Sequence, residues 1–148
     1  MSRLCSISID FQTAQHSRLD LLLLLVEQGW RFDRLYLPPN DQGMFDWQDW
    51  PTDQWSQLCV TLKQIEKANE LIGVSFQWQD TGIGGTFHID PISTDTSSKR
   101  LWTVLGADRP RLIDTYWFTD YGWYLKRILP AFWQADAYIA SVECRDMY

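Results

Sequence analysis

The 148-residue chain combines 45% hydrophobic with 22% charged residues, a balance that is typical of a folded globular protein and excludes extended disorder. Its length favours a single domain, residues 1–148, with a sizeable core. The formal net charge is −6 and the thirteen Lys and Arg residues form no basic cluster, which argues against nucleic-acid binding.

The N-terminal third of the chain predicts two strands around a helix. Residues 5–12 alternate apolar and polar side chains, the pattern of a half-buried strand. Ser17 begins a leucine-rich helix with a capping-box-like start, and Gly29 suits its C-terminal end. Residues 30–37 alternate less cleanly and are predicted as a second strand, before a Pro- and Asn-containing loop.

The segment of residues 44–51 interleaves large rings with acids between two turn signals. One interpretation is a lid that its rings pin onto the core. The other is a recognition loop that offers Trp47 and Trp50 to a partner, with Asp46 and Asp49 beside them. Both interpretations remain open at this point.

The middle of the chain predicts a second helix and a β-hairpin. Thr52 is expected to cap the helix, which has apolar residues at helical spacing from Trp55 to Ile65. Residues 71–90 then alternate on either side of Asp80-Thr81-Gly82, which predicts a hairpin with a turn at these three residues. We expect the rest of the sheet to assemble around this hairpin, since an isolated hairpin is marginal in water.

The C-terminal third predicts further strands and a third helix. Residues 101–105 and 112–118 are predicted as a second hairpin. Thr119 is expected to cap a helix that Pro130 breaks or kinks. Residues 138–145 alternate and predict a last strand, placed at an edge by its charges. This order predicts an α+β fold, a mainly antiparallel β-sheet covered on one face by about three helices.

Asp80-Thr81-Gly82 matches the tripeptide at the heart of aspartic proteases, in which two such carboxylates share a proton and activate a water. The retroviral-like proteases place it after a very apolar strand, whereas Gln77 and Gln79 precede it here. The same three residues suit a hairpin turn on conformational grounds. We therefore predict a turn and keep the protease as a remote third hypothesis.

His88 and Asp90 share one face of a predicted strand and offer two ligand types. The other histidine, His16, brings no third ligand at an informative spacing, so no metal site is predicted. A hydrogen-bonded sheet histidine is the preferred interpretation. The alternative is a small-molecule or enzymatic pocket between sheet and helices, in which His88 and Asp90 orient a ligand. Nucleotide-binding and nucleophile motifs are absent, and no cofactor is predicted.

Aromatic content is the unusual feature, with nine Trp, six Tyr and seven Phe. We expect several rings to remain exposed, and exposed Trp and Tyr favour binding surfaces. Trp123 and Arg127 are expected to form an exposed cation–π pair. The composition resembles that of bacterial toxin-neutralising immunity proteins, which are small, acidic and Trp-rich.

The leading hypothesis is a non-enzymatic protein–protein interaction module that neutralises a partner through an aromatic and acidic surface. The acidic balance would suit a basic partner protein. The candidate binding residues are Trp47, Trp50, Asp46, Asp49, Trp117 and Trp123.

Three widely spaced cysteines without a CxxC pair indicate buried thiols in a reducing compartment. The first residues lack the apolar segment of a signal peptide, and the longest apolar run, residues 21–26, is too short to span a bilayer. We therefore expect a cytoplasmic protein without membrane contact.

Overall fold

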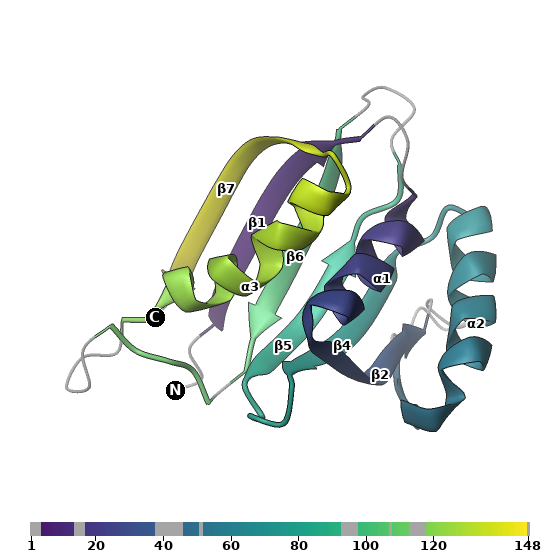
Figure 1. Cartoon of the computed structure of the whole chain (residues 1–148), viewed down its shortest axis with the longest axis horizontal. Helices are drawn as coiled ribbons and strands as arrows, with labels where there is room; N and C mark the ends of the chain where they lie inside the picture. The colour runs from purple at the N-terminus through teal and green to yellow at the C-terminus, as the bar shows by residue number, and fades with distance from the viewer. Residues whose placement is uncertain are drawn as a thin grey trace.

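The computed structural model describes residues 4–13, 17–37, 46–50, 52–92, 98–106, 108–112 and 118–147. These residues form one seven-stranded antiparallel sheet with three α-helices, which confirms the predicted α+β fold (Figure 1). The elements in chain order are β1 (Leu4–Gln12), α1 (Arg18–Gln28), β2 (Trp30–Leu37), β3 (Asp46–Asp49), a 3₁₀ turn (Thr52–Gln54), α2 (Trp55–Lys67), β4 (Ile72–Trp78), β5 (Gly84–Ile89), β6 (Lys99–Leu105), α3 (Tyr121–Gln134) and β7 (Tyr138–Met147).

The strands lie in the order β3-β2-β4-β5-β6-β1-β7, and every neighbouring pair is antiparallel. The predicted hairpin, β4 and β5, lies inside the sheet, and β7 lies at an edge as predicted. The second predicted hairpin is wrong, because β6 has β5 on one side and β1 on the other. Residues 113–117 lie outside the described part of the chain.

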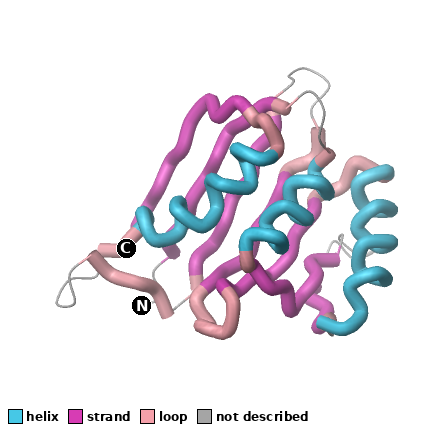
Figure 2. The backbone as a smooth tube through the Cα atoms, in the orientation of Figure 1, coloured by secondary structure: helices cyan, strands magenta, loops and turns pink. Residues whose placement is uncertain are grey.

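All three helices lie on the same face of the sheet (Figures 1 and 2). Helix α1 lies between α2 and α3 and contacts both, which explains why its leucines are buried on more than one side. The inward faces of the strands supply the other half of the core, and a T-shaped contact at 4.9 Å between Phe11 and Phe132 joins β1 to α3.

Local signals at the ends of α1 are confirmed. The Ser17 hydroxyl accepts a hydrogen bond from the Asp20 amide at 3.1 Å, and the Asp20 carboxylate accepts one from the Ser17 amide at 2.9 Å. Gly29 ends the helix at φ 126°, where a Cβ would lie 2.9 Å from the Trp78 ring. Both the positive φ and the close ring favour glycine here.

Two other predicted helix signals are wrong. Thr52 begins a 3₁₀ turn, and α2 begins only at Trp55. Asp120 caps α3 instead of Thr119, because the Thr119 hydroxyl donates to Asp146. Of the two outcomes predicted at Pro130, a break or a kink, the break does not occur, because α3 continues through Pro130 to Gln134. Buried residues on both sides of the proline hold the two halves of α3 to the core.

Candidate functional site

Residues 46–49 form the edge strand β3 rather than a lid or a loop. The Trp47 ring lies edge-on against His88, with 5.9 Å between ring centroids. Trp50 packs against the core and its indole N–H donates to the Gln54 carbonyl at 3.0 Å. Asp49 forms an exposed ion pair with Arg34 at 3.2 Å. The two rings are therefore held by the protein itself.

Trp123 is held by the core as well. Its ring packs edge-on against Trp30 at 6.4 Å and against Tyr124 at 5.0 Å. The predicted cation–π pair is present, with the Arg127 guanidinium carbon 4.1 Å from the Trp123 centroid, but both residues are partly buried. Of the other candidates, Trp117 and the side chain of Asp46 lie outside the described residues.

His88 and Asp90 share a face, as predicted, and Trp102 joins them. The His88 ring stacks on Trp102 with 3.8 Å between centroids, and the Trp102 indole donates to Asp90 at 2.7 Å. His88 is only 5% exposed, and burial lowers its pKa to about 4 although the Asp90 charge opposes this. The imidazole is therefore neutral near pH 7.

The position of His88 is a correction to the alternative hypothesis. Phe87 and Ile89 point into the core beneath the helices, so His88 points to the opposite face of the sheet. A pocket between sheet and helices cannot be lined by this side chain. Within the described ranges, no three His, Cys, Asp or Glu residues are grouped in a way that could hold a metal.

Asp80-Thr81-Gly82 forms the turn between β4 and β5, as predicted. The Thr81 amide and hydroxyl both donate to the Trp78 carbonyl, at 3.1 and 2.7 Å, and Gly82 has a φ of 72°. Gln77 accepts a hydrogen bond from the Gly82 amide at 3.2 Å, so it supports the turn. The Asp80 side chain is exposed and forms an ion pair with Arg31. These contacts account for the tripeptide without any protease chemistry.

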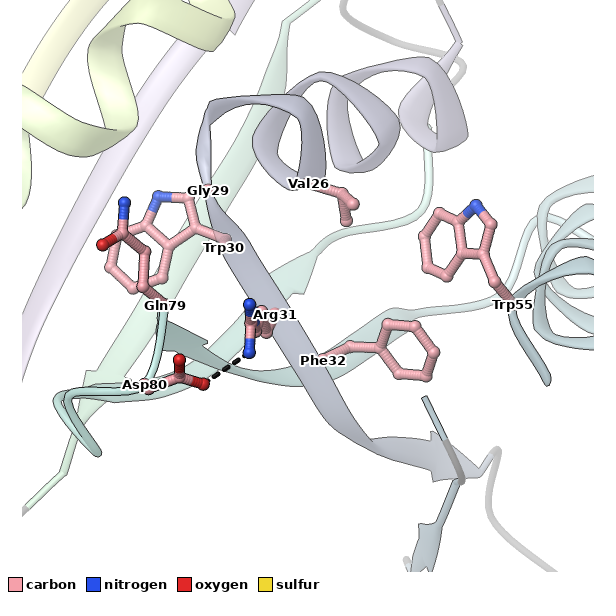
Figure 3. Close-up of a pocket in the computed structure, with 8 residues that line it drawn as sticks. All are labelled: Val26, Gly29, Trp30, Arg31, Phe32, Trp55, Gln79 and Asp80. Carbon is pink, nitrogen blue, oxygen red and sulfur yellow. Dashed lines mark hydrogen bonds and ion pairs between the residues drawn. The ribbon is translucent and has the colours of Figure 1, made fainter. Parts of the chain in front are cut away.

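A cleft of about 590 Å³ opens between α1, the start of α2, β2 and the β4–β5 turn (Figure 3). One wall is apolar, where the rings of Phe32 and Trp55 lie 4.8 Å apart. The opposite wall is polar and carries the Arg31–Asp80 ion pair next to Gln79. The sequence alone does not reveal this cleft, since its walls come from four separate elements.

A polar cluster joins the end of β7 to the start of α3. The Asp146 carboxylate accepts hydrogen bonds from the Thr119 hydroxyl at 2.8 Å and the Tyr121 hydroxyl at 2.7 Å. Burial raises the pKa of Asp146, but hydrogen bonds from Cys5, Tyr121 and Thr119 outweigh this and hold it at about 2. Burial also raises the pKa of the Cys5 thiol, the opposite of what a nucleophile needs. We interpret the cluster as structural.

Among the tryptophans that the structure describes, the most exposed indole lies on α3. Trp133 is 86% exposed and borders a groove of about 650 Å³, named here the α3–β7 groove, whose surface is almost entirely apolar. The lining residues are Gly122, Leu125, Lys126, Leu129, Pro130, Trp133, Ala137 and Ile139.

The spacing of apolar residues along α3 is a sequence signal for this groove. Leu125, Leu129 and Trp133 recur every four residues, which places them in one stripe along α3. This stripe runs beside the buried residues Tyr124, Ile128 and Phe132. Helix α3 therefore carries a second apolar stripe, in which Leu125 and Leu129 pack partly against the core and Trp133 stays exposed.

No protein-family model, curated protein or solved structure matches the chain. Among the described helices, none combines the length and the apolar character required to cross a membrane. The function is therefore inferred from the surfaces of the chain itself.

Proposed function

We propose that the chain is a protein-binding module whose docking surface is the α3–β7 groove, with Trp133 as its central anchor. The occupant is an apolar segment of a partner protein that carries basic residues. The exposure of Trp133 beside an apolar groove is the observation that supports this function. Trp is enriched among the residues that dominate binding energy at protein interfaces.

The energetic argument starts from the area of the indole. A Trp side chain buries roughly 200 Å², and about 25 cal/mol is gained for each apolar Å² removed from water. With 86% of Trp133 exposed, covering the ring would contribute up to about 4 kcal/mol before the costs of association. Three of the tryptophans predicted from the sequence as binding residues are described by the structure, and none of them offers a comparable area. Trp47, Trp50 and Trp123 all pack on the protein.

The net charge of the chain supports the choice of a basic partner, whereas the one charged residue in the described lining of the groove is Lys126. The chain has a net charge of −6, which would speed the approach of a cationic protein. Asp136 is exposed next to the anchor, and its amide donates to the Trp133 carbonyl at 3.1 Å. The cytoplasm is the proposed setting, since all three cysteines are free thiols of the kind that reducing compartments preserve.

The test compares wild type with Trp133→Ala and with a matched control, Val60→Ala, at an exposed apolar residue of α2. Immobilised proteins capture partners from the native host, and a protein held by wild type and Val60→Ala is purified for calorimetry. We expect Trp133→Ala to raise its Kd about thirty-fold and Val60→Ala to leave it unchanged. Equal Kd values for all three proteins would refute the proposal. It would also be refuted if wild type captured no protein that Trp133→Ala fails to capture.

The cleft of Figure 3 supports a second candidate function, the binding of a small aromatic carboxylate. Its ring would pack on Phe32 and Trp55, and its carboxylate would replace Asp80 at Arg31. An exposed ion pair contributes only about 0–1 kcal/mol, so Asp80 is readily displaced. Indole-3-acetate should shift the NMR signals of Trp55 in the wild-type protein. Tryptamine, an amine, should not shift them, and indole-3-acetate should not shift them in the Arg31→Gln variant. Equal shifts from acid and amine, or no shifts at millimolar acid, would exclude this function.

A further inference from the structure

The outer edge of β7 is unpaired in the described chain. Strand β7 runs over Tyr138–Met147 and pairs with β1, and no described strand lies on its other side (Figure 1). An edge of this length presents a row of backbone donors and acceptors that can pair with another chain. Val142, which opposes buried Ile9 in β1, remains 41% exposed at this edge.

A β-bulge divides β7 into two parts. Ser141 is opposite Asp10 and Ile139 is opposite Phe11, so Ala140 is an extra residue without a partner in β1. Bulges bend the strand and limit regular pairing. The regular part is therefore residues 141–147, all of which oppose consecutive residues of β1.

We propose that residues 141–147 of β7 pair antiparallel with the same segment of a second copy of this chain, so that the two sheets join across a two-fold axis at Cys144. Full overlap of a seven-residue segment with itself requires this centre, because residue 144 is its midpoint. Glu143 then lies directly opposite Arg145 of the second copy, and Arg145 opposite Glu143 of the second copy.

Charge complementarity selects this register. Glu143 and Arg145 are exposed on the sheet face away from the helices, since they alternate with core-facing Cys144, and they already pair with each other within the strand. In the dimer each carboxylate lies between two guanidinium groups. A shift of the centre to Glu143 or to Arg145 would place like charges opposite each other, which destabilises strand pairing.

The dimer is distinct from the proposed docking function. Trp133, Ala137 and Ile139 line the α3–β7 groove, and they precede the bulge at Ala140, so the paired segment does not include them. The paired segment is short, and we therefore expect a concentration-dependent dimer of micromolar affinity rather than an obligate one.

The first test is charge reversal, followed by sedimentation velocity over a range of concentrations. Glu143→Arg and Arg145→Glu should each weaken dimerisation about ten-fold or more, since each places two pairs of like charges across the axis. The double variant E143R/R145E should restore wild-type dimerisation because the symmetric register pairs the exchanged charges again. The control Arg34→Glu, on β2 next to the other edge strand, should dimerise as wild type does.

The second test is cross-linking with a short bis-maleimide in the Cys59→Ser background, where Cys5 is buried and the half-buried Cys144 is the remaining thiol. A cross-linked dimer is expected, and it should disappear in the additional variant Cys144→Ser. A monomer at every concentration, or a dimer that neither single reversal weakens, would overturn the proposal. Trp133→Ala should dimerise normally, so failure of the docking function and failure of this dimer give different results.

Discussion

Acid should destabilise this fold through His88, a buried neutral imidazole. Its folded pKa lies at about 4, because burial disfavours the charged form, while an unfolded histidine titrates near 6.5. Well above pH 6.5 neither state binds the proton, so His88 makes no pH-dependent contribution there. Between the two pKa values only the unfolded chain is protonated, and stability therefore falls as the pH is lowered.

The magnitude follows from the difference between the two pKa values. A change from 6.5 to about 4 is roughly 2.5 units, and each unit corresponds to about 1.36 kcal/mol. The free energy of unfolding should thus fall by about 3 kcal/mol between pH 7 and pH 4. This is a large share of the 5–15 kcal/mol that is typical of a folded protein.

The assay is urea unfolding followed by circular dichroism at half-unit steps from pH 7.5 to 4. Wild type is compared with His88→Phe, which keeps a ring on Trp102 but cannot titrate. The difference between the two curves isolates His88, since all other groups are common to both proteins. Parallel curves for the two proteins across this range would show that the reasoning about His88 is wrong.

Three further predictions concern stability and use urea unfolding at pH 7 unless stated. Burial raises the pKa of Asp146, yet its hydrogen bonds hold it at about 2, so its contribution is present above pH 3.8 and lost as the pH falls towards 2. Asp146→Asn should therefore lower the free energy of unfolding by about 2 kcal/mol and make it less dependent on pH between 3.8 and about 2. A pH dependence equal to that of wild type would contradict this. Gly84→Ala should lower the free energy of unfolding by more than about 2 kcal/mol, because its Cβ would lie 1.9 Å from the Phe76 carbonyl oxygen. A variant as stable as wild type would show that β4 and β5 can move apart at no cost. Arg127→Met removes the cation 4.1 Å from the Trp123 ring and should lower the free energy of unfolding by about 1 kcal/mol. No loss is expected if the Arg127 side chain contributes only the packing of its methylene groups.

Much of the fold could be predicted from local patterns. Alternation identified β1 and the β4–β5 hairpin, and Ser17 and Gly29 marked the two ends of α1. These signals are local because a cap or a turn is made by residues a few positions apart. The error at Thr119 arose because another interaction took the capping residue, as its bond to Asp146 shows. The error at Thr52 arose because a 3₁₀ turn precedes α2.

The candidate sites were harder to predict, because exposure is a tertiary property. Period two shows that His88 and Asp90 share a face, but only the docking of the helices determines that this face lies away from them. The chain alone likewise cannot show that Trp47 and Trp123 find neighbours while Trp133 does not. Side-chain type and spacing establish the strands, the helices and their apolar faces, since those depend on near neighbours. Three features depend on contacts between distant parts of the chain, which form only when the whole sheet assembles. They are the insertion of β1 between β6 and β7, the free edge of β7 and the exposure of Trp133.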